Sequence, residues 1–214
     1  MELNSNQSPK KGKEAIEENE PIKEQQNIIV TNNTNNTSTL KEVNMDKKII
    51  ERISRLLSEM CEESKKKKKN KNVKNEYIKP FLSKIIPTIS IQDYIGRFRK
   101  YTKISPSTFV IMLIYIGRFS NICKINLSFY NIHKLILSAI IVAIKYNEDE
   151  NLSFEVYSKI GGVNNAELVN LEYKFISYIN YNLFITDEIF DKFNNYISSP
   201  ESDDEDDIFD DNDD

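Results

Sequence analysis

The sequence predicts an all-α domain flanked by polar tails. Apolar residues recur at spacings of three and four through most of the chain, which is the period of amphipathic helices. Only five of the 214 residues are glycine, and no apolar–polar alternation at hairpin spacing supports strands. The segment at residues 133–147 (HKLILSAIIVAIKYN) has a middle that is apolar on every side. A helix of this kind belongs at the centre of a bundle.

Three segments are too polar to belong to the folded core. Residues 1–44 include the run TNNTNNTST and lack the apolar surface that offsets the entropy of ordering, so we expect them to be disordered. Residues 64–76 contain KKKKKNKNVKN, whose like charges and Asn residues favour a loop. Residues 200–214 hold 10 of the 33 acidic residues and no Lys or Arg. We expect them to form a disordered acidic tail.

An amphipathic helix is expected at residues 45–63, between the first tail and the lysine-rich loop. Asn44 or Asp46 is its candidate N-cap. Six residues at helical spacing form its apolar face: Ile49, Ile50, Ile53, Leu56, Leu57 and Met60.

Residues 77–199 form the predicted globular domain, and its helices are marked by their start signals. Ser90, with Asp93 three residues later, approximates a capping box that opens a helix at Ile91. Ser105 and Pro106 read as an N-cap followed by proline at the first helical position. This second helix is expected to run to about Ser120.

The remaining helices are marked in the same way. Ser128 or Asn131 opens the third helix, which is the apolar one, and Ser153 opens a short fourth helix that Gly161 and Gly162 end. A capping-box pattern at Asn164 and Glu167 opens the fifth, and Thr186 caps a last helix.

Composition argues against several classes of protein. Cys61 and Cys123 lack a CxxC spacing, so we interpret them as reduced thiols of an intracellular protein. The start lacks the apolar stretch of a signal peptide, and the longest apolar run, FVIMLIYI, is far shorter than a membrane span. Without the acidic tail the formal charge is 29 minus 23, or +6, which is too weak to indicate nucleic-acid binding. We expect a protein without membrane or nucleic-acid partners.

No catalytic or cofactor signature is found in the sequence. Kinase motifs such as HRD and DFG, a Gly-rich phosphate loop and a Ser/His/Asp set are absent. His133, the single histidine, has no metal-ligand partner at suitable spacing and reads as structural. We therefore expect no enzyme activity, no metal and no cofactor.

Three segments resemble P-type cyclins, the phosphate-pathway group also called P/U-type. They are residues 89–119 (ISIQDYIGRFRKYTKISPSTFVIMLIYIGRF), 131–149 (NIHKLILSAIIVAIKYNED) and 157–183 (YSKIGGVNNAELVNLEYKFISYINYNL). The resemblance covers roughly residues 81–196. It implies a five-helix cyclin box preceded by an N-terminal helix. It also implies a non-catalytic subunit that binds and activates a cyclin-dependent protein kinase.

The resemblance also implies a kinase-binding face. Lys145 and Glu172 match the cyclin residues that hydrogen-bond the kinase beside its mobile C-helix, and we expect them to lie next to each other. Without the resemblance, Lys145 would simply complement the dipole at a helix C-terminus. Four further residues occupy positions where cyclins place apolar contacts: Val142, Tyr146, Ile176 and Tyr181.

One position departs from the family pattern. Cyclins usually read Tyr-Ile-Asp-Arg in the second helix, with the aspartate paired to a basic residue of the first helix. This chain reads Tyr115-Ile116-Gly117-Arg118. We consider Asp93 as an alternative partner for Arg118.

Two other functions remain open at the level of sequence. One is a nucleic-acid-associated scaffold, because cyclin-like folds also occur in transcription factors, although those carry two repeats and a zinc ribbon. The other is a helical adaptor that activates no kinase. The run Lys65–Lys69 is either a solvated loop or a nuclear-import signal, so both nucleus and cytoplasm are open. Ser8 (SPKK) and Ser202 (SDDE) are candidate phosphorylation sites.

Overall fold

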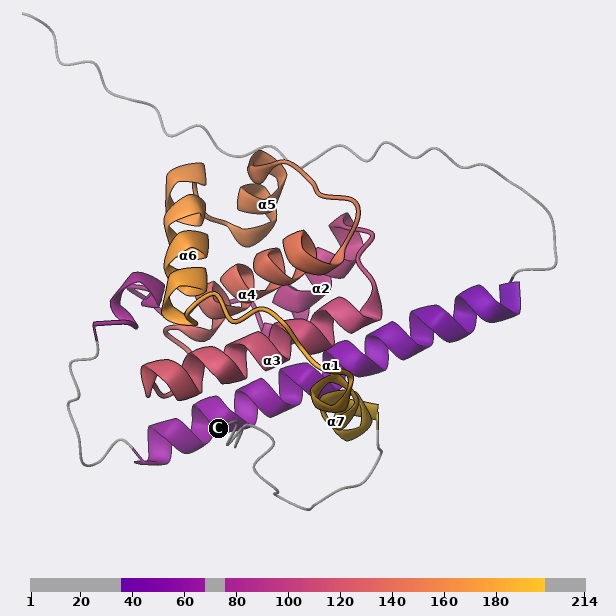
Figure 1. Ribbon diagram of the computed structural model, residues 1–214, viewed down its shortest axis with the longest axis horizontal. Coiled ribbons are helices and arrows are strands. Elements are labelled where there is room, and N and C mark those ends of the chain that lie inside the picture. Colours follow the sequence, from indigo (N-terminus) through magenta and orange to yellow (C-terminus); the bar gives the residue numbers. More distant parts are fainter. Residues whose placement is uncertain (1–35, 68–75, 199–214) are drawn as a thin grey trace, which may run out of the picture. The chain divides into compact units, whose positions relative to one another are not determined.

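The computed structural model describes residues 36–67 and 76–198, with side chains from 47–66 and 76–198. All structural statements below concern these residues. The predicted acidic tail, most of the lysine-rich loop, Ser8 and Ser202 lie outside them. The described chain contains helices and no strands, which confirms the all-α prediction (Figure 1). Its elements are α1 (Asn36–Lys67), η1 (Lys79–Phe81), α2 (Ile91–Tyr101), α3 (Pro106–Cys123), α4 (Ile132–Asn147), α5 (Phe154–Gly161), α6 (Asn165–Tyr178) and α7 (Asp187–Ser198).

The first helix is longer than its sequence pattern predicted. It begins at Asn36 instead of residue 45, so the proposed caps Asn44 and Asp46 are wrong. The prediction of disorder is also wrong for residues 36–44, which are helical. Once a helix has nucleated, each added residue costs little, and this stretch contains no proline or glycine. At its other end the helix extends to Lys67, into the lysine-rich segment. There Lys65 Nζ lies 3.5 Å from Glu62 Oε2, and this ion pair offsets some of the repulsion between neighbouring lysines.

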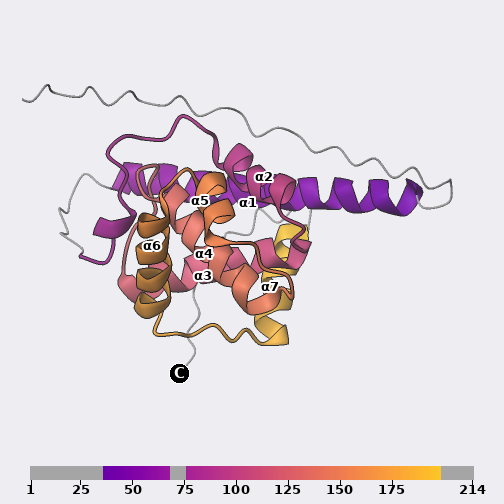
Figure 2. The same ribbon diagram turned by 90° about the horizontal axis from the view of Figure 1, so that it is seen from above.

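The predicted apolar face of α1 holds the helix against the bundle. It packs on α2, α3 and α7, as Figures 1 and 2 show. Ile53 and Leu57 are fully buried, Ile49 and Ile50 nearly so, and Leu56 and Met60 are partly covered. Cys61 lies on the same face, and burial raises the pKa of its thiol to about 12.

The helix α4 occupies the centre, as its uniform apolarity predicted. Every side chain from Ile132 to Ile144 except Lys134 is buried. The helix contacts α2, α3, α5, α6 and η1, with α3 its most extensive neighbour. Its ends are therefore the parts that can carry polar chemistry.

The helix α3 is also a core element. Its 18 residues are apolar enough to cross a membrane by length and composition alone, the one such helix in the described ranges, but the core helix of a soluble protein passes the same test. In this fold 67% of it is buried inside the bundle. Its neighbours α1, α4, α6 and α7 cover it.

Side-chain caps form at the predicted starts of α2 and α6. The Ser90 hydroxyl accepts a hydrogen bond from the backbone amide of Asp93 at 3.0 Å. The side-chain oxygen Oδ1 of Asn164 accepts one from the backbone amide of Glu167 at 2.8 Å. Asn131, and not Ser128, is the N-cap of α4. The starts of α2 and α6 were predictable because each of these caps joins residues three positions apart.

The adjacent glycines at the end of α5 have two different roles. Gly162 is the C-cap and adopts φ +70°, in the left-handed region that suits glycine. Gly161 instead provides space, because a Cβ there would lie 2.6 Å from Cδ1 of Leu137 in α4. The short helix can therefore pack directly on the central one.

The expected pairing of Asp93 with Arg118 is wrong. Arg118 Nη1 donates to the backbone oxygens of Asn182 at 3.0 Å and Phe184 at 2.8 Å, in the loop between α6 and α7. The Asp93 carboxylate instead accepts from the Ser90 hydroxyl within its own helix start. The guanidinium thus fixes a loop, a role that helix periodicity cannot reveal.

His133 has a structural environment, as predicted. Its Nε2 lies 3.0 Å from the carbonyl oxygen of Ile89, and because a carbonyl only accepts, Nε2 carries the proton. The ring packs edge-to-face on Tyr94 with centroids 5.0 Å apart. Burial lowers the pKa of His133, although the hydrogen bond to Ile89 opposes this. The imidazole is therefore neutral at pH 7.

Candidate functional site

The structure brings Lys145 and Glu172 together, as expected. Lys145 is in the last turn of α4 and Glu172 is in the middle of α6. Their Nζ and Oε1 atoms are 2.6 Å apart. The Glu172 side chain is 12% exposed and that of Lys145 32% exposed. The pair therefore lies at the boundary between core and solvent, where its outer edge remains accessible.

An aromatic ring fixes Lys145 from a second direction. Its Nζ lies 4.0 Å from the ring centroid of Phe154, the first residue of α5. A cation over an aromatic face is attracted by the ring quadrupole. The ammonium is thus positioned by residues of three helices, α4, α5 and α6.

Exposed and half-buried apolar side chains lie near this pair along α6 and α4. Val169, Tyr173 and Ile176 follow one face of α6 at spacings of four and three, beside Glu172. Tyr173 is 65% exposed, and Tyr146, next to Lys145 on α4, is 53% exposed. We define the α4–α6 face as Lys145, Tyr146, Val169, Glu172, Tyr173 and Ile176. Exposed apolar side chains that gather on one face are typical of protein-binding surfaces.

The predicted apolar contacts divide into two groups. Tyr146 and Ile176 belong to the α4–α6 face, and Tyr181 is exposed just after α6, with φ +57°. Val142 is only 2% exposed, so in this structure it supports α4 from within the core and presents no surface to a partner. Val169 and Tyr173 were not among the apolar contacts predicted from the sequence, although their helical spacing around Glu172 could have indicated that they lie on the same face.

Glu148, directly after α4, was also missed. Its carboxylate accepts from both the amide and the hydroxyl of Ser105 at 2.8 Å, and from the Thr108 hydroxyl. From its position just after α4, it therefore caps the N-terminus of α3, where the Ser105 side chain makes no cap hydrogen bond of its own. Burial raises the pKa of Glu148, but the hydrogen bonds outweigh it and hold the pKa below its ordinary range.

Replacing Glu148 by glutamine should lower stability by about 1 to 2 kcal/mol at pH 7, the range of a helix N-cap. Because the folded-state pKa is lowered, the charged form stabilises the fold above the unfolded-state pKa of about 4.3. The stability difference from wild type should shrink as the pH falls through the folded-state pKa. Urea unfolding between pH 3 and 7 measures this, with Glu150→Gln as an exposed control. If the stability difference between wild type and Glu148→Gln did not change with pH, the negative charge of Glu148 would not contribute to the stability of the fold.

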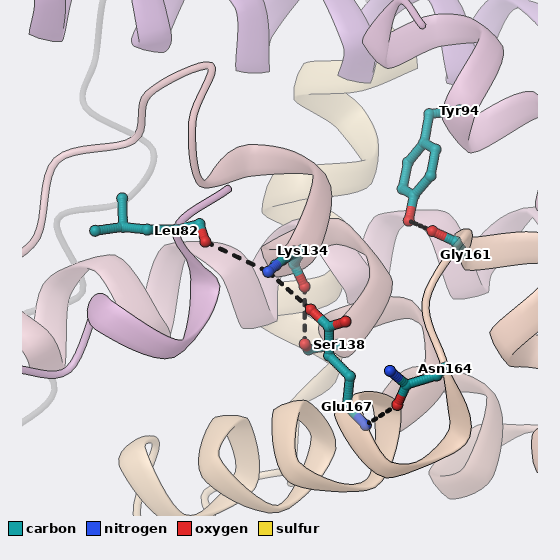
Figure 3. A network of polar contacts seen from close by, with 7 residues as sticks. All are labelled: Leu82, Tyr94, Lys134, Ser138, Gly161, Asn164 and Glu167. Carbon is teal, nitrogen blue, oxygen red and sulfur yellow. Dashed lines mark hydrogen bonds and ion pairs between the residues drawn. The ribbon is translucent and has the colours of Figure 1, made fainter. Parts of the chain in front are cut away.

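A second ion pair joins α4 to α6 at the other end of α4. Figure 3 shows Lys134 Nζ 2.8 Å from Glu167 Oε1 and 3.3 Å from the carbonyl oxygen of Leu82. Nearby, the Tyr94 hydroxyl donates to the Gly161 carbonyl at 3.0 Å and ties α2 to the end of α5. The Lys134–Glu167 pair has the same residue types as Lys145–Glu172 but lies in the first turns of both helices.

The arrangement is suited to recognition. Among the described residues, no group of His, Cys, Asp and Glu could hold a metal ion. The α4–α6 face instead combines a prearranged ion pair with exposed aromatic side chains. Such a surface can bind another protein through hydrogen bonds at its centre and apolar contacts around them.

A known protein family matches the part of the chain that contains the α4–α6 face. A family model described as "Cyclin" matches residues 23–183, which include Lys145 and Glu172. Cyclin-U2-2 of Arabidopsis thaliana is 35% identical over 112 residues, 50% of this chain and 47% of that protein. Cyclin-P3-1 of Oryza sativa subsp. japonica is 30% identical over 104 residues, 49% of this chain and 44% of that protein. The chain spans about half the length of the curated relatives it matches.

Proposed function

The chain belongs to the cyclin family, and its relatives are P/U-type cyclins; we propose that it binds a cyclin-dependent protein kinase and switches it on. One observation carries the proposal. The Lys145–Glu172 pair is already formed and partly exposed, and exposed apolar side chains lie beside it along α4 and α6. The resemblance to cyclins implies that these two residues hydrogen-bond the kinase. In this proposal the chain acts as a regulatory subunit inside the cell, in the nucleus, the cytoplasm or both.

The geometry of the pair supports tight recognition. One bond joins Lys145 to Glu172, which leaves further ammonium donors and the second carboxylate oxygen available to a partner. Because Glu172 and the ring of Phe154 already hold the ammonium, less conformational entropy is lost on binding than for a free lysine. Tyr146 and Tyr173 can then exclude water around the polar contacts.

In this proposal the kinase is activated because the α4–α6 face contacts its mobile C-helix. Protein kinases require an ion pair between a lysine on strand β3 and a glutamate on the mobile C-helix. In the proposed complex the α4–α6 face packs against this C-helix and holds the glutamate in place. The chain contributes no catalytic group, so it shifts the population of active kinase.

A pulldown with the tagged full chain tests the proposal. Mass spectrometry of proteins recovered from native extract should identify a protein kinase that is enriched over a matched bait. The matched bait is the Lys145→Ala/Glu172→Ala double variant. Equal recovery of all kinases by both baits would contradict the proposal. Recovery of nucleic acid with steep salt dependence, and no kinase, would favour the scaffold alternative.

A further inference from the structure

A row of basic residues follows one face of α1, away from the α4–α6 face. Lys48, Arg52 and Arg55 are spaced by four and three residues, which places them on one side of the helix. Lys48 and Arg55 are exposed and Arg52 is half-buried. Within the described residues, Arg55 forms a long, exposed ion pair with Glu51, at 3.6 Å. We call these three residues the α1 basic stripe.

The stripe lies beside the point where the described chain ends. The helices α1 and α7 pack against each other in both views (Figures 1 and 2). Arg52 Nη2 donates to the carbonyl oxygen of Tyr196 at 3.4 Å, in the last turn of α7. That turn contains no basic residue of its own. Arg52 therefore supplies the positive charge that a helix C-terminus favours.

The sequence that follows α7 has the opposite charge. Residues 201–207 read ESDDEDD, with six acidic residues and Ser202. Ser202 is four residue steps from Ser198, and four steps span up to about 14 Å when extended. The stripe from Lys48 to Arg55 is about 10 Å long. The acidic segment can thus lie along the stripe without crossing the bundle.

We propose that residues 201–207 dock on the α1 basic stripe, and that phosphorylation of Ser202 tightens this contact. The short tether gives the acidic segment a high effective concentration at the stripe. A phosphate adds about −1.5 to −2 charges and forms bidentate hydrogen bonds with arginine. Lys65 competes less well, because it lies ten residues beyond Arg55, about 15 Å further along the helix. The docked tail joins α7 to α1 independently of any kinase.

A spin label on the tail of the full chain tests the contact. Both native cysteines are buried, so Ile208→Cys offers a single reactive thiol and leaves Ser202 and every tail charge intact. At low salt the label should broaden amide NMR signals of residues 47–56 selectively. At 0.5 M salt the broadening should disappear. Phosphorylated Ser202 should raise the ratio of docked to free tail by about 1.4- to 5-fold, the range for an exposed ion pair.

Charge reversal separates this contact from general attraction. Lys48→Glu/Arg55→Glu should abolish the broadening, while Lys84→Glu/Lys103→Glu, with two exposed lysines elsewhere, should leave it unchanged. Circular dichroism checks that both variants are folded. Broadening that is spread evenly over the surface, confined to residues 65–69 or insensitive to reversal of the stripe would overturn the proposal.

Discussion

Alanine at Lys145 or at Glu172 is expected to weaken binding of the partner kinase by roughly 30-fold to several thousandfold. Removing one member of a hydrogen-bonded charge pair that an interface buries costs about 2 to 5 kcal/mol, and 1.4 kcal/mol is tenfold in affinity. An exposed salt bridge would contribute only about 0 to 1 kcal/mol. Titration calorimetry or surface plasmon resonance with the purified kinase decides between these ranges. Activation of the kinase should fall in parallel.

The second ion pair between α4 and α6 provides the matched control. Lys134→Ala and Glu167→Ala remove the same residue types from the same two helices, at a site outside the α4–α6 face. They should change kinase affinity by less than about fivefold. In all four variants the melting temperature of the free chain should fall by no more than a few degrees. A large loss of stability confined to Lys145→Ala and Glu172→Ala would instead identify the pair as an internal support of the bundle.

Phe119→Ala should destabilise the fold by about 3 to 5 kcal/mol, the range for a buried phenylalanine. The Phe119 ring is stacked on Phe175 of α6, with centroids 5.0 Å apart and planes within 9°. It also meets the ring of Phe81 of η1 edge-on at 5.0 Å. Because all three rings are fully buried, the truncation leaves a cavity where α3, α6 and η1 meet.

The measurement is urea or thermal unfolding, with a melting temperature lower by roughly 6 to 20 °C. Phe184→Ala is the control, because Phe184 is 69% exposed and should change stability by less than about 0.5 kcal/mol. Similar losses for both phenylalanines would contradict the assigned packing.

Local signals explain why much of the fold was predictable. The starts of α2 and α6 depend on a side chain and an amide three residues apart, and both hydrogen bonds are present. The uniform apolarity of α4 likewise placed it at the centre of the bundle. The start of α1 at Asn36 was not predictable from its apolar face, because a polar stretch can extend a helix that packing has already nucleated.

The site required information that periodicity does not carry. Lys145 and Glu172 are 27 residues apart, and only the resemblance to cyclins predicted that they would meet. Glu148 and Arg118 find their partners 40 or more residues away, on segments whose relative placement depends on the packed bundle. The burial of Val142 also follows from packing, since α4 is apolar on all sides and its exposed face cannot be read from its pattern.

The most direct test of the proposed function is kinase activity in the reconstituted complex. Purified full chain is titrated into its purified partner kinase, and phosphorylation of a peptide substrate is measured. We expect a rate that rises and saturates at one chain per kinase, while the Lys145→Ala/Glu172→Ala variant leaves the rate at its basal value. A kinase that binds the wild-type chain without any rise in rate, or that both proteins activate equally, would contradict it.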